Sequence, residues 1–113
     1  MAEKSKKEGE QTMSYAKRVD DNHKEVVTEV RRYLPEATVR DLSGSGKGIP
    51  DLLIGWQGIN FLFEIKDPEK PASARSLTEA QKVFHGEWQG QVKIAHSATE
   101  ICAHIARYLL KKH

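Results

Sequence analysis

Two carboxylates and a lysine, Asp51, Glu64 and Lys66, are the residues whose types and spacing best suit catalytic chemistry. The carboxylates are separated by two apolar runs joined at Gln57-Gly58, a pair that suits a two-residue hairpin turn. With that turn, Asp51 lies directly opposite Glu64. A four-residue turn would slide the pair by two positions on the same face, and a three-residue turn would break it. Opposed side chains have Cβ atoms about 4.5–5.5 Å apart, where like charges repel. The pattern therefore favours a cation between the two carboxylates.

The second strand of this hairpin separates the polar from the apolar side chains. Because side chains alternate along a strand, Glu64 and Lys66 share one face, and Phe61, Phe63 and Ile65 share the other. Two carboxylates suit Mg²⁺ or Mn²⁺, hard cations that prefer oxygen ligands. Such a cation could activate water and orient a phosphodiester, with Lys66 positioning the water or neutralising the phosphate.

The alternative interpretation is an ordinary ion pair between Glu64 and Lys66 at the end of a strand, since a bare Glu-x-Lys is common. Pro50-Asp51 at the start of the paired strand favours a site instead. A phosphate-binding loop at residues 43–48 is excluded, because Gly48 follows Lys47 where the Walker A motif needs Ser or Thr. This segment is expected to be a flexible loop that brings Lys47 near phosphate.

Seven elements are expected to position these residues. In order, they are a helix over 24–34, strands over 38–42, 51–54 and 59–66, a helix over 78–88, a strand over 91–95 and a helix from 98 to about 110. The order α-β-β-β-α-β-α predicts one α/β domain over residues 15–113, with a central mixed sheet flanked by helices. Residues 1–14 are predicted to be a disordered polar tail. Asn22 with Glu25, and Ser97 with Glu100, are expected to form capping boxes.

The composition of the 113 residues excludes several classes of protein. No stretch approaches the roughly 20 apolar residues of a membrane span, and no apolar segment near the N-terminus suggests a secretory signal. The single Cys102 excludes an internal disulfide and a cysteine zinc site, and a cytoplasmic location is expected. Residues 1–19 account for the whole formal net charge of +2, so the overall charge is weak evidence for nucleic-acid binding.

Three segments in this order resemble the VRR-NUC nucleases of the PD-(D/E)xK superfamily: GIPDLLIG at 48–55, FEIKD at 63–67 and LTEAQ at 77–81. The similarity extends from about Asp20 to Gly90. The resemblance implies a restriction-endonuclease-like core and phosphodiester cleavage that depends on Mg²⁺ or Mn²⁺. For stand-alone phage and bacterial members, it implies a homodimer that resolves four-way (Holliday) junctions.

The resemblance also implies roles for individual residues. Asp51 and Glu64 would be metal ligands, the backbone carbonyl of Ile65 a further ligand, and Lys66 a catalytic residue. Gln81 matches the glutamine of the family and would be a catalytic residue.

Gln81 also has a structural interpretation, because Thr78-x-x-Gln81 is a capping box. The two roles are compatible. His85, one turn further along this helix, is expected to lie on the surface.

The first helix departs from the superfamily pattern, which often brings a helix glutamate into the site. On a helical wheel at about 100° per residue, His23 lies near the centre of the apolar face, and Glu25 and Glu29 lie far from it. We therefore predict that His23 takes the position in the site, with Glu25 as a cap. Asp20 and Glu29 are possible substitutes, and a buried structural histidine is the alternative.

Lys47, Lys70 and Arg75 are expected to contact the DNA backbone. The predicted function is a metal-dependent, structure-selective DNA endonuclease in the cytoplasm of a bacterium or a phage-infected host cell, with branched DNA as its partner. The alternatives are a non-catalytic nucleic-acid-binding module on the same fold and a nuclease for flap or linear DNA. The presence of Asp51, Glu64, Lys66 and Gln81 together favours the enzyme.

Overall fold

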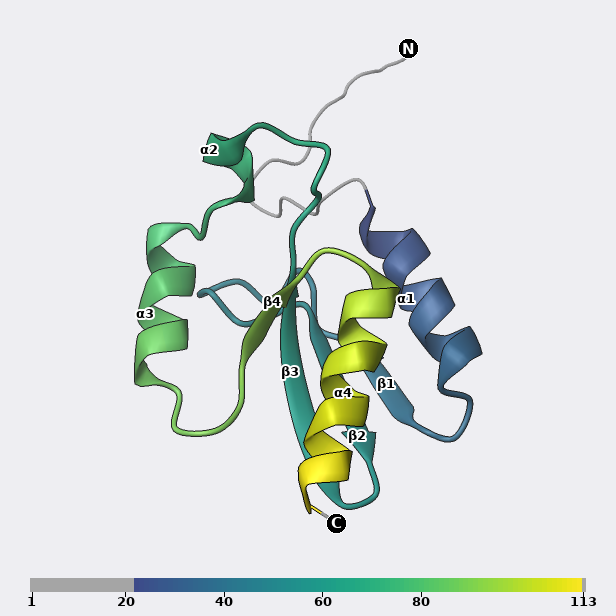
Figure 1. Cartoon of the computed structure of the whole chain (residues 1–113). Helices are drawn as coiled ribbons and strands as arrows, with labels where there is room; N and C mark the ends of the chain where they lie inside the picture. Colours follow the sequence, from purple (N-terminus) through teal and green to yellow (C-terminus); the bar gives the residue numbers. More distant parts are fainter. Residues whose placement is uncertain (1–21, 113) are drawn as a thin grey trace.

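The computed structural model describes residues 22–112, in which a mixed four-stranded sheet combines with helices in an α/β fold (Figure 1). The elements are α1 (His23–Tyr33), β1 (Thr38–Asp41), β2 (Leu52–Trp56), β3 (Ile59–Ile65), α2 (Ala72–Arg75), α3 (Glu79–Glu87), β4 (Lys93–Ala95) and α4 (Ala98–Lys112). The strand order is β1-β2-β3-β4, with β4 parallel to β3 and the other neighbours antiparallel. This confirms the expected mixed sheet. The predicted tail over residues 1–14, the domain start at residue 15 and Asp20 lie outside the described residues.

The turn between β2 and β3 sets the register of the sheet. Gln57 and Gly58 have φ angles of 53° and 79°, and positive φ at both central residues is the mark of a type I′ turn. Leu52 consequently faces Phe63, and the same register holds along the whole hairpin. The predicted two-residue turn and its register are confirmed.

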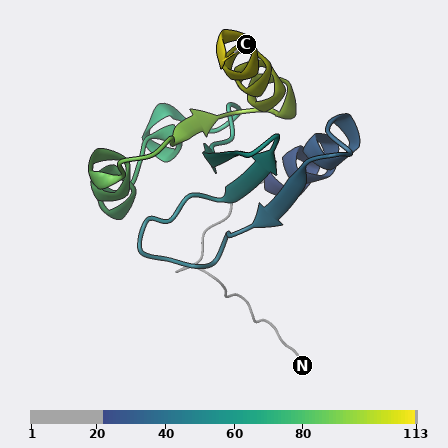
Figure 2. The same cartoon turned by 90° about the horizontal axis from the view of Figure 1, so that it is seen from below.

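The apolar core lies on one face of this sheet, where α1 and α4 pack (Figure 2). Phe61, Phe63 and Ile65 are each 1% exposed and belong to this core, as the alternation predicts. The other core residues are Val26, Val27, Val30, Val39, Leu52, Ile54, Ala95, Ala98, Ile101 and Ile105. Glu64, between two core residues of β3, therefore points to the opposite face.

Two local expectations are corrected. Asn22 does not cap α1 with its side chain, because its Nδ2 donates to the carbonyl of His96 at 3.1 Å. The segment between Lys66 and Thr78, expected to be a loop, contains the single helical turn α2, which starts directly after Pro71. The capping box predicted for Ser97 and Glu100 forms only by half. Glu100 N donates to Ser97 Oγ at 3.1 Å, but the Glu100 carboxylate accepts from the N–H of His96 at 2.8 Å.

None of the helices in the described part of the chain has the length and the apolar composition of a membrane-spanning segment.

His104 places a titratable group against the aromatic core. Its ring meets Phe61 and Phe63 edge-on, with centroids 6.2 and 5.7 Å apart. Its Nε2 is buried and has no hydrogen-bond partner among the described residues. Burial lowers the pKa of His104, and the positive charges of Lys93 and Arg107 lower it further. The folded protein therefore favours the neutral form of this imidazole.

We expect His104→Leu to reduce the acid sensitivity of the fold. Since the pKa of His104 in the folded state lies below the ordinary value of 6.5, the unfolded chain binds more protons below that pH. The stability contributed by the neutral imidazole is complete above about pH 6.5 and is lost as the pH falls below it. Urea denaturation at about pH 7.5 and about pH 5.5 should show a smaller loss of unfolding free energy in the variant than in the wild type. Equal losses would contradict this assignment.

Candidate active site

Asp51 and Glu64 lie opposite one another at one end of the β2–β3 hairpin. The register of Leu52 with Phe63, extended by one residue, pairs Asp51 with Glu64. Asp51 Oδ2 also accepts a hydrogen bond from the backbone N–H of Ile65 at 2.8 Å. A side chain of the residue just before β2 thus takes the place of a main-chain partner at the end of the strand pair.

The backbone carbonyl of Ile65 lies on the same side of β3 as Asp51. In an extended residue the N–H and C=O point to the same edge, and the N–H of Ile65 points to Asp51. Lys66 points the other way, because its N–H donates to Ala95 O at 3.0 Å. The extended register places the buried Pro50 opposite Ile65, and proline has no N–H to donate to the carbonyl. The carbonyl oxygen of Ile65 therefore lies on the side of β3 that faces Asp51, and Pro50 donates no hydrogen bond to it.

Glu64 and Lys66 form a buried pair that Gln81 of α3 bridges. Glu64 is 3% exposed and Lys66 is 6% exposed. Gln81 Nε2 donates to Glu64 Oε2 at 2.9 Å, and Lys66 Nζ donates to Gln81 Oε1 at 3.0 Å. Lys66 Nζ lies 3.9 Å from Glu64 Oε2. Because a charge is costly to bury without a partner, this network stabilises both ionised groups.

The same glutamine caps α3. Its Oε1 also accepts from the N–H of Thr78 at 2.9 Å, and its own N–H donates to Thr78 Oγ1 at 3.2 Å. The predicted capping box is confirmed. The single amide of Gln81 thus joins the start of α3 to the buried charges of β3.

The loop between β1 and β2 lies under the first turn of α3. A Cβ on Gly48 would lie 2.2 Å from the carbonyl oxygen of Ala80 and 2.9 Å from the N–H nitrogen of Gln81. Gly48 also has φ +76°, a conformation that glycine adopts at little cost. Lys47, predicted to lie near phosphate, is exposed in this loop and also has a positive φ.

The other two predicted DNA contacts lie in the segment that follows Lys66. Arg75 is exposed at the end of α2, and its Nε donates to the backbone carbonyl of Lys70 at 2.8 Å. Lys70 is half-buried. Asp67, between these residues and the site, is buried and accepts a hydrogen bond from the N–H of Glu69 at 2.9 Å.

The structure does not bring His23 to the carboxylate pair, contrary to the prediction. His23 is buried, as the helical wheel indicates, but its Nε2 lies 3.1 Å from Asp41 Oδ2. Asp41 faces Leu52, so its side chain leaves the sheet on the core face, opposite to that of Glu64. On α1, the possible substitute Glu29 is half-buried, and Glu25, expected to be a cap, is exposed.

Asp41 remains ionised in this position. Burial raises the pKa of its carboxyl group, but hydrogen bonds from the hydroxyl and N–H of Ser43 and from His23 lower it by more. Ser43 Oγ and N lie 2.6 and 2.9 Å from Asp41 Oδ1. The hydrogen bonds from Ser43 therefore connect the pair of His23 and Asp41 to the beginning of the β1–β2 loop.

His85 lies nearer to the site than its expected surface position. It follows Gln81 by one turn of α3, is half-buried, and has a buried Nε2 without a hydrogen-bond partner in residues 22–112. Burial lowers the pKa of His85, and the ammonium of Lys66 lowers it further. The spacing of four residues from Gln81 is the signal in the sequence for this placement.

Asp51 and Glu64 are oxygen donors of the kind that a hard divalent cation prefers. Within residues 22–112, no three His, Cys, Asp or Glu side chains lie close enough together to hold a metal ion. The candidate protein ligands in this part of the chain are Asp51, Glu64 and the carbonyl of Ile65. Mg²⁺ commonly binds through one or two carboxylates and keeps several of its waters, so this donor set suits it.

No protein-family model, curated protein or solved structure matches this chain.

We expect Gly48→Ala to destabilise the protein more than Gly46→Ala. The two glycines have nearly equal φ angles, +76° and +79°, so the backbone strain of an added Cβ is shared. Only at Gly48 would the Cβ meet the backbone of Ala80, because nothing lies within 4 Å of the same position at Gly46. The additional loss at Gly48 should be about 1–3 kcal/mol, the usual cost of overpacking. Urea denaturation followed by circular dichroism measures it, and equal losses would argue against this contact.

Gln81→Ala should destabilise the protein more than Thr78→Ala. Each variant breaks the capping box, which costs about 0.5–2 kcal/mol. Only the loss of Gln81 also leaves the buried charges of Glu64 and Lys66 without their bridge, which should add about 1–3 kcal/mol. The same denaturation experiment compares the two variants. Equal effects would mean that the bridge contributes no stability.

Proposed function

We propose that this chain is a metal-dependent DNA endonuclease with a PD-(D/E)xK core. The observation that carries the proposal is the opposition of Asp51 and Glu64, beside Lys66 and the carbonyl of Ile65, at one end of the sheet. Three oxygen donors and one ammonium group on neighbouring strands form a set suited to phosphodiester hydrolysis. The α/β fold with its mixed sheet supports this family, as does the predicted glutamine on α3.

Asp51, Glu64 and the carbonyl of Ile65 would hold Mg²⁺ or Mn²⁺, which polarises a phosphoryl oxygen and lowers the pKa of a bound water. Lys66 would stabilise negative charge on the phosphate or position the attacking water. Its ammonium has three N–H donors, and Gln81 accepts from one of them. Gln81 is therefore a positioning residue, because it fixes the ammonium of Lys66 and the carboxylate of Glu64 relative to each other.

We further propose branched DNA as the substrate and a homodimer as the active form. Two cuts in a four-way junction need two sites, which a two-fold dimer would supply. Tyr33 of α1 and Leu110 of α4 are 50% and 77% exposed, so they could take part in an interface. Tyr108, by contrast, packs edge-on against Phe61 with ring centroids 5.5 Å apart and is partly buried against the internal core.

We expect Asp51→Asn and Glu64→Gln each to reduce cleavage more than about 100-fold, a larger effect than outer-shell substitutions usually have. In the Asp51→Asn variant, the side-chain amide oxygen could still accept from the N–H of Ile65, so this variant should stay folded. Glu64→Gln removes the countercharge of Lys66 and should also lower the unfolding free energy. Cleavage of four-way, flap and linear DNA with Mg²⁺, Mn²⁺ or EDTA is the measurement.

Glu69→Gln is the matched control, because Glu69 is exposed and near the site in sequence. It should cleave like the wild type. Near wild-type cleavage by a folded Asp51→Asn or Glu64→Gln variant would end the nuclease proposal. DNA binding by the wild type without cleavage under any metal condition would favour the non-catalytic binding module.

A further inference from the structure

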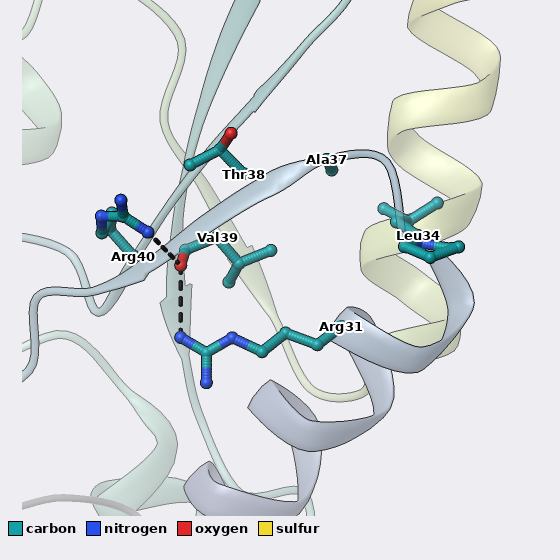
Figure 3. Close-up of a pocket in the computed structure, with 7 residues that line it drawn as sticks. Arg31, Leu34, Ala37, Thr38, Val39 and Arg40 are labelled. Carbon is teal, nitrogen blue, oxygen red and sulfur yellow. Dashed lines mark hydrogen bonds between the residues drawn. The ribbon is translucent and has the colours of Figure 1, made fainter.

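A groove of about 500 Å³ lies at the edge of the sheet formed by β1 (Figure 3). Its walls come from the end of α1, the turn after it and β1. Arg31 and Arg40 line it from these two elements, and Thr38 contributes a hydroxyl group. None of the described residues that line it is acidic. The groove is therefore basic and polar on one side and apolar on the other.

The two arginines converge on one atom of β1. Arg31 Nη2 donates to the carbonyl oxygen of Val39 at 3.2 Å, and Arg40 Nη1 donates to the same oxygen at 3.4 Å (Figure 3). Leu42 N donates to Asp51 O, so the N–H of Leu42 points toward β2. Because alternate residues of a strand direct their N–H and C=O groups to opposite edges, the C=O of Val39 points away from β2. The outward acceptor of the edge strand is thus occupied by side chains. An added β-strand would have to displace them.

In the part of the chain that the structure describes, no carboxylate forms an ion pair with either guanidinium. Both arginines are exposed. Two like charges that share one neutral carbonyl repel each other. An anion between them would relieve this repulsion. The planar guanidinium matches the oxygens of phosphate in pairs, and the exposed Thr38 hydroxyl offers a further donor.

The groove borders the face of the sheet that carries the carboxylates. Arg40 faces Leu53, which faces Leu62, so the side chain of Arg40 leaves the sheet on the same face as Glu64. Arg40 is two strands across and two residues along from Glu64. With strands about 4.8 Å apart and about 3.4 Å per residue, their Cα atoms are about 12 Å apart. One DNA strand carries a phosphate per about 3.4 Å of helix axis, so this is a span of a few phosphates.

We propose that Arg31 and Arg40 bind a phosphate of the DNA backbone, a few nucleotides from the phosphate held at the carboxylate pair. The ligand is a phosphodiester, and the inference rests on the proposed function for the identity of that ligand as DNA. The site would hold the strand at the β1 edge while the scissile phosphate lies beside Lys66. This contact lies at the β1 edge of the sheet, whereas α3 lies toward the opposite edge (Figure 1).

The test compares Arg31→Gln/Arg40→Gln with the control Arg32→Gln/Arg107→Gln. The control removes the same charge from exposed positions of α1 and α4 that do not line the groove. Glutamine keeps an amide donor, and circular dichroism shows whether each variant is folded. Binding to duplex DNA is measured in EDTA by fluorescence anisotropy at salt concentrations from about 50 to about 200 mM.

The groove variant should lower the slope of log K against log salt by about 0.9, the value for one phosphate contact. Its affinity difference from the wild type should then shrink about 3.5-fold over this salt range. The control variant should lower the slope by less than the groove variant does. An unchanged slope in the folded groove variant, or an equal reduction in the control, would overturn the proposal.

Two further measurements separate other occupants of the groove. Binding of inorganic phosphate by calorimetry together with an unchanged DNA slope would identify a site for the free anion and overturn the proposal. A change of molecular mass by light scattering with an unchanged DNA slope would assign the groove to a second copy, with the same consequence. Because binding is measured in EDTA, a chain that shows the expected slope but never cleaves DNA would lose the nuclease proposal and keep this site.

Discussion

The buried pair of Glu64 and Lys66 is the constraint on which the arrangement of this site depends. Both residues are almost fully withdrawn from water, and removing a charge from water is costly unless a partner and hydrogen bonds offset the loss. Gln81 supplies those hydrogen bonds, and it can do so only if the first turn of α3 lies at the end of β3. No residue of α3 is buried, so apolar packing alone does not determine where this helix lies. The hydrogen bonds of Gln81 therefore determine both where α3 lies and how Glu64 and Lys66 are arranged.

The loop between β1 and β2 makes hydrogen bonds at its start and a backbone contact near its end, and these interactions position Asp51. At its start, Asp41 accepts from Ser43, and Leu42 N donates to Asp51 O at 2.7 Å. Near its end, Gly48 lies against the backbone of α3. His23 contributes through Asp41, on the core face of the sheet, and not by contact with the carboxylates. A helix residue can thus support a site from which the sheet itself separates it.

The features that the sequence predicted are those determined by residues close together along the chain. The turn at Gln57-Gly58 sets the register of the hairpin, and alternation then assigns each side chain of β3 to a face. Similarly, the capping box between Thr78 and Gln81 depends on three residues of spacing. Such local signals are sufficient to derive the opposition of Asp51 to Glu64 without any tertiary contact.

The predictions that failed depend on packing between distant segments. A helical wheel shows that His23 of α1 is buried, but it does not show on which face of the sheet the helix lies. The prediction therefore places His23 in the site, whereas its ring contacts Asp41 on the other face. Asn22 has an acceptor 74 residues away that competes with the local cap. The convergence of Arg31 and Arg40 likewise needs the end of α1 beside β1, because each alone is an ordinary exposed arginine.

Pro50 explains why the oxygen donors gather at this end of the sheet. Without an N–H, Pro50 cannot donate to the carbonyl of Ile65 across the ladder. The N–H of Ile65 in turn donates to the side chain of Asp51. The ladder therefore ends with carboxylate and carbonyl oxygens, which suit a cation. At the β1 edge the outward acceptor Val39 O is occupied by two guanidinium groups, which suit an anion. The metal ion and the nucleic-acid strand that we propose as ligands would need both kinds of surface, and this sheet would offer them at two places where its hydrogen-bond ladders end.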